Sequence, residues 1–191
     1  APQPNINTAA AGLIVRLDPD GPATAYLGST ELHADVAAKT TATRTYTALG
    51  KPVAVRYSKA GYAFGAVADL SADPHSTAEV ALATDTLRIT TRYFDPFGNA
   101  RDQSPVAWPA SHGFLDKPTD AVNGTVHLGA RDYDPLLGRF LSVDPMLDTK
   151  DAQSINGYAY ANNNPITLAD PSGLDPAGPC SQWDNRRCYP G

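Results

Sequence analysis

Long apolar runs, positive charge and cysteine are all scarce in this sequence of 191 residues. No stretch approaches the roughly 18 consecutive apolar residues that a membrane-spanning helix needs, so we expect no insertion into a membrane. Lys and Arg number 15 against 20 Asp and Glu, which gives a formal net charge of −5. Because proteins that bind nucleic acids usually carry a basic surface, this balance argues against a nucleic-acid partner.

The two cysteines and four histidines do not form a metal-binding pattern. Cys180 and Cys188 lie near the C-terminus with seven residues between them. They can close a small disulfide loop, which would suit an oxidising environment outside the cell, or they are two free thiols on a frayed tail. Tetrahedral zinc needs four ligands, so we expect neither a metal nor another cofactor. The histidines are scattered along the chain as His33, His75, His112 and His127.

Short runs rich in Thr, Val, Tyr and Ala alternate with turn-forming residues along most of the chain. Spacings of about 8–14 residues between turns are typical of consecutive antiparallel strands. The sequence therefore predicts an all-β fold of mainly antiparallel strands and turns, with at most a short helix around residues 145–158. Residues 99–124 are expected to be irregular, with Trp108 and Phe114 as buried anchors. Strands are expected over residues 24–36 (as one or two strands), 41–48, 52–58, 62–69, 76–84 and 86–95.

One short motif occurs twice, 39 residues apart. Residues 92–98 read RYFDPFG and residues 131–138 read RDYDPLLG, so each copy has Arg, one further residue, an aromatic residue and Asp-Pro, with Gly shortly after. Asp-Pro is expected to begin a turn, and Gly to supply a backbone conformation that other residues avoid. We therefore expect the two copies to be equivalent strands that pair in one sheet, so that residues 127–174 fold as one unit with the strands upstream.

Residues 127–174 carry four sequence blocks in a fixed order: RDYDPLLGRF, SVDP, NGYAYANNNP and DPSGL. In this order and at this spacing, the blocks resemble the terminal core segment of bacterial Rhs (rearrangement hotspot) and YD-repeat proteins. Further similarity upstream is to the actinobacterial version of this core, and it extends the resemblance over residues 24–174.

The resemblance implies a fold, a reaction and partners. Rhs and YD-repeat chains wind long spirals of β-strands into a hollow shell around a C-terminal toxin, so this chain would be a fragment of such a spiral. In several of them the core segment is an intramolecular aspartyl protease, which cuts its own chain once, after the Leu of Asp-Pro-x-Gly-Leu. Carried over residue by residue, the implied site is Arg131, Asp144 and Asp170, with the cut between Leu174 and Asp175. The protein would be secreted or on the bacterial cell surface.

Two carboxylates that share a site can hydrolyse a peptide bond. One accepts a proton from water while the other, in its protonated form, polarises the peptide carbonyl. Like charges close together drive the two pKa values of such a pair apart, which supplies both forms. Arg131 would orient a carboxylate and balance the local charge through a charge-assisted hydrogen bond. Gly173 would allow the chain to approach the pair closely.

The same residues also have a purely structural interpretation. Asp-Pro is an ordinary turn initiator and occurs seven times in the chain, so most copies must be plain turns. Arg131 and Arg139 can both be strand residues paired with a neighbouring Asp. The asparagines at 162–164, before Pro165, fit a turn better than a binding site. The alternative function is therefore a non-catalytic structural or adhesion module.

These interpretations divide the chain into three parts. Residues 1–22, rich in Pro, Asn, Ala and Gly, are a loose lead-in, residues 23–174 are the core, and residues 175–191 are a short tail after the cleavage position. Such a tail is too short to fold as an enzymatic toxin, and a core of this length is too short to enclose a cargo. We therefore expect the end of a longer spiral or a stand-alone remnant, with the rest of a shell or the chain's own C-terminal peptide as its partner.

Overall fold

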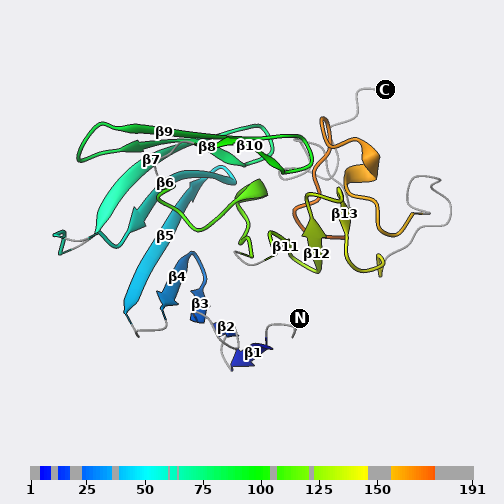
Figure 1. Ribbon diagram of the computed structural model, residues 1–191, viewed down its shortest axis with the longest axis horizontal. Helices are drawn as coiled ribbons and strands as arrows, with labels where there is room; N and C mark the ends of the chain where they lie inside the picture. Colours follow the sequence, from blue (N-terminus) through cyan, green and yellow to red (C-terminus); the bar gives the residue numbers. More distant parts are fainter. Residues whose placement is uncertain are drawn as a thin grey trace.

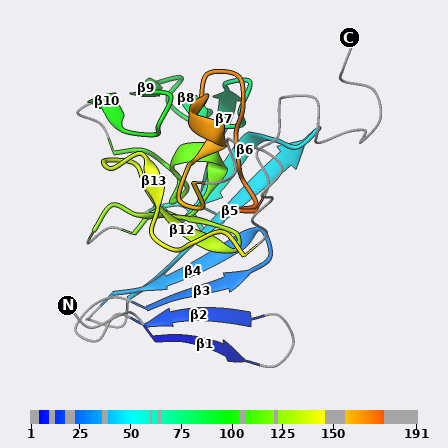
Figure 2. The same ribbon diagram turned by 90° about the vertical axis from the view of Figure 1, so that its right-hand side faces the viewer.

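The chain folds into two antiparallel sheets with very little helix. Ten strands form one sheet in which each strand pairs with the next along the sequence, and three more strands form a second sheet. Figures 1 and 2 show the ten strands stacked in sequence order, with the small sheet across one side of the stack. The computed structural model describes residues 5–9, 13–17, 23–35, 39–59, 61–63, 65–103, 107–120, 123–145 and 156–174.

The predicted all-β fold class is confirmed by these elements. The only helical segments among the described residues are two 3₁₀ turns, η1 (Phe114–Asp116) and η2 (Ala161–Asn163). The small sheet contains β11 (Val126–Leu128), β12 (Arg131–Asp134) and β13 (Arg139–Phe140). The large sheet contains β1 (Asn5–Ala9), β2 (Leu13–Leu17), β3 (Ala23–Leu27), β4 (Thr30–Ala34), β5 (Thr40–Ala48), β6 (Lys51–Tyr57), β7 (Ala66–Ala72), β8 (Ala78–Ala83), β9 (Ile89–Phe94) and β10 (Ala100–Gln103).

Strand positions follow the turn signals closely where those signals are strong. Leu49 and Gly50 both have positive φ, so they join β5 to β6 in a tight hairpin of the kind that the sequence predicts. The structure corrects the loose lead-in at residues 1–22, because β1 and β2 lie within it. β1 pairs with β2, and β2 pairs with β3, so these two strands extend the large sheet at its N-terminal edge. Most of the predicted helix around residues 145–158 lies outside the described residues.

The two copies of the Arg-x-aromatic-Asp-Pro motif lie in different sheets, which corrects the expectation that they pair in one. The first copy begins in β9 and the second in β12. Their turns nevertheless meet. The Tyr133 hydroxyl donates a hydrogen bond to the carbonyl oxygen of Phe97 at 2.7 Å, and the side-chain amide of Asn99 donates to that of Pro135 at 2.9 Å. The repeat therefore joins the two sheets.

Aromatic side chains form the main core between the sheets. Phe114, Tyr133, Phe140 and Tyr160 are each at most 4% exposed. The rings of Tyr133 and Tyr160 have centroids 4.5 Å apart, at the close end of the range for aromatic pairs. From β9, Phe94 packs on Phe114 with a centroid distance of 6.3 Å. Phe114 is therefore a buried anchor, as the sequence predicts.

Trp108, the other predicted anchor, is only partly buried and packs beside a small cluster around Val55 on the large sheet. The guanidinium of Arg92 lies 3.9 Å from the centroid of its ring. Arg92 also donates hydrogen bonds to the carbonyl oxygens of Ala78 at 2.8 Å and His112 at 2.9 Å. Burial lowers the pKa of Arg92 to about 10, so the side chain remains charged at neutral pH.

A largely buried ionic cluster ties β4 to the segment after β10. Nε2 of His112 lies 2.5 Å from Glu31, and Nδ1 lies 3.0 Å from Asp116. Burial alone would lower the pKa of His112, but its hydrogen bonds with Asp116 and Glu31 outweigh burial and raise the pKa to about 9. Burial opposes ionisation of Glu31 as well, yet hydrogen bonds from His112, His33 and Ser111 lower its pKa to about 2. No spacing in the sequence indicates this cluster, because Glu31 is far in the chain from His112 and Asp116.

We predict that this cluster makes the protein less stable at alkaline pH. The pKa of His112 is raised from 6.5 to about 9 in the folded protein, so its contribution is complete below pH 6.5 and is lost as the pH rises through 9. The free energy of unfolding should fall by about 3 kcal/mol over that range. Urea denaturation at pH 6.5 and pH 9 measures the fall. His112→Gln should show a much smaller change, whereas His127→Gln, which removes a half-exposed partner of Asp132, should behave as wild type. An equal fall in wild type and His112→Gln would contradict this assignment.

Leu115 tests whether the two sheets unfold together. It is 3% exposed, and its backbone N–H donates to the Thr77 hydroxyl oxygen, next to β8, at 3.0 Å. Leu115→Ala should lower the free energy of unfolding by about 2–5 kcal/mol and shift one common transition. The matched variant Leu136→Ala removes a side chain of a residue that is 84% exposed and should change the free energy by less than about 0.5 kcal/mol. Two separate transitions in circular dichroism and fluorescence would argue against a single folding unit.

Candidate functional site

The structure brings Arg131, Asp144 and Asp170 together around a single nitrogen atom. Nη2 of Arg131 lies 2.9 Å from Oδ2 of Asp144 and 3.2 Å from Oδ2 of Asp170. Both carboxylates are therefore within reach of one donor, although they come from separate loops. The three residues implied by the Rhs resemblance share one place in the fold.

Arg131 is the centre of this arrangement. It begins β12, and its side chain is 2% exposed. Its Nε donates to the carbonyl oxygen of Gly173 at 2.5 Å, and its Nη1 donates to that of Gly157 at 3.1 Å. The guanidinium also lies over the ring of Phe140, 3.6 Å from the centroid, where the ring face attracts the positive charge. One side chain thus joins β12 to the loops that follow it.

Asp170 is fully buried, and both of its carboxylate oxygens are engaged. Oδ2 faces Arg131, while Oδ1 accepts hydrogen bonds from the Ser172 hydroxyl at 2.9 Å and from the backbone N–H of Leu174 at 3.1 Å. These partners offset the large cost of burying a carboxylate. The side chain of Asp170 therefore bonds residues of its own Asp-Pro turn. It holds Leu174, the residue after which the resemblance implies cleavage.

Asp144 lies on the more open side of the pair, with its side chain 16% exposed. Its backbone N–H donates to the carbonyl oxygen of Gly157 at 2.8 Å, the same oxygen that accepts from Arg131. That shared acceptor fixes the Asp144 backbone relative to the guanidinium. The two aspartates therefore differ: solvent reaches Asp144 and does not reach Asp170.

Two glycines allow the segment after Asp170 to lie against the β11–β12 turn. Gly173 has a φ of +68°, and a Cβ there would overlap the carbonyl oxygen of Leu128. Gly129 has a φ of +58°, and a Cβ there would overlap the carbonyl oxygen of Ser172. A side chain at either position would strain the backbone and push the segment away from the guanidinium. The close approach expected at Gly173 is therefore present.

Other Asp-Pro turns use their carboxylates locally, as the structural interpretation expects. Asp95 accepts hydrogen bonds from two backbone N–H groups of its own turn, and Asp134 does the same. Arg139 is exposed and lies opposite Asp134 in the β12–β13 pair, away from the cluster around Arg131. Asn162 and Asn163 have positive φ within η2, which fits a turn.

Several expectations fall on residues that the structure does not describe. Asp175, Cys180 and Cys188 lie outside the described ranges, so the far side of the cleavage position and the disulfide stay predictions. Within the described ranges, no group of His, Asp and Glu has an arrangement that would hold a metal ion. In the same part of the chain, no helix has the length and apolar character required to cross a membrane.

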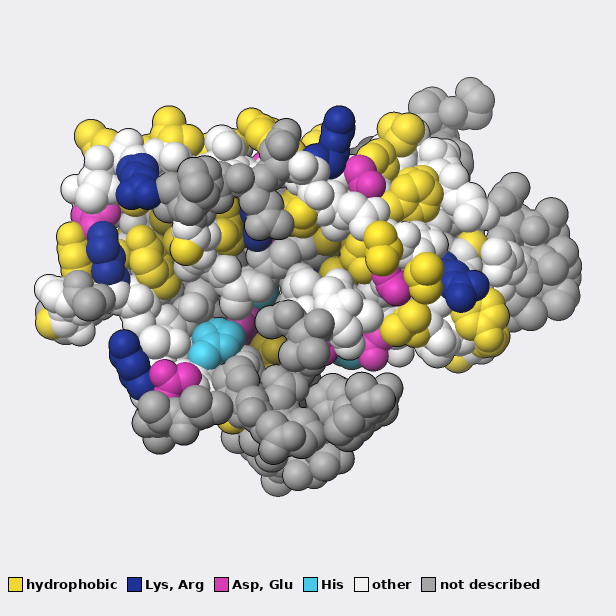
Figure 3. Space-filling view, viewed as in Figure 1, with side chains coloured by type: hydrophobic (Ala, Val, Ile, Leu, Met, Phe, Trp, Pro, Cys, Tyr) yellow, Lys and Arg dark blue, Asp and Glu magenta, His cyan; other side chains and the backbone are white. Residues whose placement is uncertain are grey.

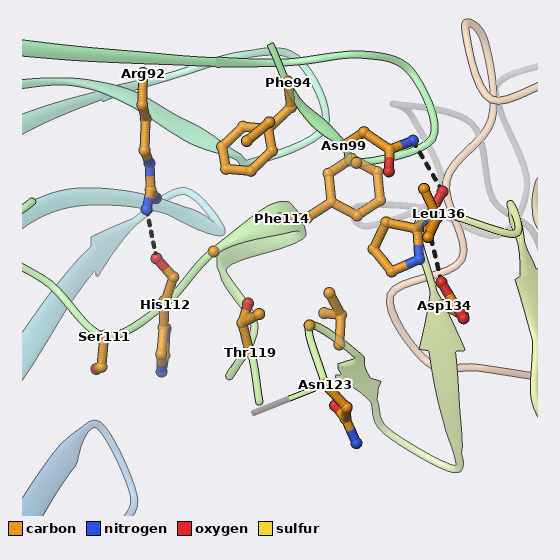
Figure 4. Close-up of a pocket in the computed structure, with 16 residues that line it drawn as sticks. Arg92, Phe94, Asn99, Ser111, His112, Phe114, Thr119, Asn123, Asp134 and Leu136 are labelled. Atoms are coloured by element: carbon orange, nitrogen blue, oxygen red, sulfur yellow. Dashed lines mark hydrogen bonds between the residues drawn. The ribbon is translucent and has the colours of Figure 1, made fainter. Parts of the chain in front are cut away.

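A cavity of about 420 Å³ opens between the two motif copies, where no sequence pattern indicates one (Figure 4). Phe114 supplies an apolar wall, and several polar groups around it already have partners. Asn99 donates to a backbone carbonyl, Asp134 accepts from its own turn, and His112 lies between two carboxylates. The three residues of the Arg131 cluster do not line this cavity. It is therefore separate from the candidate site.

Comparison with known sequences gives matches over about half of the chain. Residues 75–166 match the protein family described as Teneurin YD-shell. The tRNA nuclease WapA of Bacillus subtilis is 34% identical over 98 residues, which cover 49% of this chain and 4% of WapA. The toxin subunit YenC1 of Yersinia entomophaga is 36% identical over 93 residues, which cover 46% of this chain and 9% of YenC1.

Solved structures share the fold over most of the chain. The crystal structure of TcdB2-TccC3 without its hypervariable C-terminal region has a TM-score of 0.67 at 21% identity, over 85% of this chain and 8% of that chain. TcdB2-TccC3-Cdc42 has a TM-score of 0.64 at 23% identity, over 86% and 8%. This chain therefore spans less than a tenth of each similar protein described here. With the sequence blocks and the β architecture, these matches show that the chain is an Rhs/YD-shell protein.

Proposed function

We propose that this chain is the C-terminal core segment of a polymorphic-toxin-like Rhs/YD shell and carries an aspartyl autoprotease site. Asp144 and Asp170 would be its catalytic pair, and the cut would fall between Leu174 and Asp175. One observation carries the proposal: a single nitrogen of Arg131 bonds both aspartates, and the backbone N–H of Leu174 is bonded to one of them.

The site would act once, on its own chain. Leu174 is tethered to Asp170, and the carbonyl of Gly173 is tethered to Arg131, so the next peptide bond begins beside the aspartate pair. Water adds its oxygen to the carbonyl carbon of Leu174 while one aspartate takes a proton. The bond to the nitrogen of Asp175 then breaks, and that nitrogen leaves as an amine with a proton from the pair. Asp144 is the member that solvent water can reach.

The charge of Arg131 suits this chemistry. Two carboxylates and one guanidinium have a net charge of −1, and one shared proton makes the buried group neutral. A neutral group avoids the cost of an unpaired charge in the protein interior. General acid–base catalysis by such a pair requires one ionised and one protonated carboxyl group, and Arg131 would orient the ionised one through a charge-assisted hydrogen bond.

A structural role is the second candidate, and Arg92 favours it. Arg92 holds the same place in the first motif copy as Arg131 in the second. It also lies half-buried over an aromatic ring and donates to two carbonyl oxygens, and no aspartate among the described residues forms an ion pair with it. In this alternative, Arg131 only fastens loops to β12, and the segment is a non-catalytic structural or adhesion module.

Partners and location follow from the shell relatives. We propose that the chain packs with the rest of a larger shell or with its own residues 175–191, and that it is secreted or on the bacterial cell surface. The tRNA nuclease activity in the name of WapA belongs to that protein, of which the matched part is 4%. The acidic charge balance of this chain still argues against a nucleic-acid partner.

Replacing either aspartate tests the catalytic pair. Asp144→Asn and Asp170→Asn keep the side-chain size but remove ionisation, so each should slow cleavage by about 10²–10⁴-fold. Intact-mass measurement detects the fragment that ends at Leu174, against 20.1 kDa for the uncut chain. Asp134→Asn is the matched control, because Asp134 also begins an Asp-Pro turn but lies outside the pair, and it should cleave as wild type. Wild-type cleavage in either paired variant would exclude this mechanism, and an uncut wild-type chain would favour the structural role.

Arg131→Lys separates geometry from charge. Lysine keeps the positive charge but cannot reach two carboxylates and two carbonyl oxygens at once, so cleavage should fall by about tenfold or more. Time courses of the cleaved fraction by mass spectrometry give the rate, and circular dichroism confirms that the variant is folded. Arg139→Lys, at an exposed position, should cleave at the wild-type rate. Equal rates for the two variants would leave Arg131 without a role in cleavage.

A further inference from the structure

A cleft of about 520 Å³ lies at the far end of the large sheet from the Arg131 cluster. It is formed by the start of β5, the end of β6 and residues from the loop that follows β6. Figure 1 shows these segments at the left, with the small sheet at the right. The volume falls within the range of about 300–1,000 Å³ that is typical of small-molecule sites.

Positive charge is concentrated in this cleft. Lys39, Arg44, Arg56 and Lys59 line it together with Thr, Ser, Tyr, Ala and Gly residues, and no acidic side chain does. Figure 3 shows Lys and Arg side chains gathered at this end of the molecule. The ammonium of Lys59 forms an ion pair with Asp85, whereas the other three cations have no ion pair with any described residue. In a chain with a net charge of −5, such a concentration of cationic side chains indicates a site that attracts anions.

The register of the sheet places two of these cations opposite each other. Arg44 on β5 faces Arg56 on β6 directly. Side chains in such pairs begin about 4.5–5.5 Å apart at their Cβ atoms, and like charges in this position destabilise a sheet. The Arg44 guanidinium lies 5.4 Å from the centroid of the Tyr46 ring, and an anion between the two guanidinium groups would remove their repulsion and give both a partner of opposite charge.

The wall of the cleft opposite the sheet is held in place. The backbone N–H of Tyr62 donates to the carbonyl oxygen of Lys59 at 3.1 Å, and that of Gly65 donates to the carbonyl oxygen of Tyr62 at 3.2 Å. Gly65 has a φ of +74°, and a Cβ there would lie only 2.6 Å from the carbonyl oxygen of Tyr57. Glycine is therefore required for this close return of the chain. The result is a formed wall from which Tyr62 lines the cleft.

We propose that this cleft binds a small organic phosphate, with the phosphate between Arg44 and Arg56 and the organic part against Tyr62. A phosphate monoester carries close to two negative charges and three terminal oxygens, so it can accept hydrogen bonds from two guanidinium forks and from Lys39 together. A carboxylate has one charge and two oxygens and satisfies one fork. Inorganic phosphate matches the cations but has no group to contact Tyr62.

Calorimetric titration in 150 mM NaCl tests the site with three probes: adenosine 5′-monophosphate, inorganic phosphate and succinate. The nucleotide should bind saturably and at least about tenfold more tightly than either other probe, because only it combines a phosphate with an aromatic group. Arg44→Gln and Arg56→Gln should each weaken its binding by about tenfold or more. Arg101→Gln, which changes an exposed arginine of β10 outside the cleft, should leave binding unchanged.

Thermal denaturation gives an independent measurement. Without ligand, Arg56→Gln should be at least as stable as wild type, because it removes a like-charge pair. Adenosine 5′-monophosphate should raise the Tm of wild type and leave that of Arg56→Gln unchanged. If Arg101→Gln lost as much binding as the two cleft variants, general surface charge would explain the binding, and the proposal would be overturned. Equal affinity for the nucleotide and for inorganic phosphate or succinate would overturn the assignment of an organic phosphate.

Discussion

Arg131 is buried with its positive charge surrounded by two carboxylates, two carbonyl oxygens and an aromatic ring. This side chain holds the loops after β13 in place, because Asp144, Gly157 and Asp170 each contribute a group that bonds to it. Breaking a buried ion pair from one side typically costs about 3–5 kcal/mol, since the remaining charge is left without a partner. The same contacts that stabilise these loops also place two carboxylates beside Leu174. Stability and the proposed chemistry therefore rest on one group.

The repeated motif shows how one local sequence can have two outcomes. Both copies place an arginine over an aromatic ring and within reach of carbonyl oxygens, with Arg131 buried and Arg92 half-buried. Around Arg92 the surrounding segments supply backbone acceptors, and the side chain fastens a loop to the large sheet. Around Arg131 the later loops add Asp144 and Asp170. The difference lies in the residues that the rest of the chain places around each arginine, and the motif itself does not indicate these residues.

Sequence reasoning succeeded where the signal is local. Hairpin turns such as that at Leu49 and Gly50 depend on a few adjacent residues, so the strands on either side were predicted closely. It failed for β1 and β2, which are defined by their pairing with each other and by the pairing of β2 with β3 more than by their own composition. It also placed the two motif copies in one sheet. Their turns instead join two sheets through Tyr133, which no periodicity in the sequence indicates.

For the candidate site, the sequence by itself determined the all-β class, the turns and the residue types that can carry acid–base chemistry, because turn propensity and side-chain chemistry are properties of short segments. Family resemblance selected Arg131, Asp144 and Asp170 from among many similar residues. Only the tertiary structure decided that both aspartates meet one nitrogen atom, and that His112 lies between Glu31 and Asp116. The physical reason is that such contacts join residues far apart in the chain. They exist only when core packing and close backbone approaches, such as that at Gly173, bring the loops together.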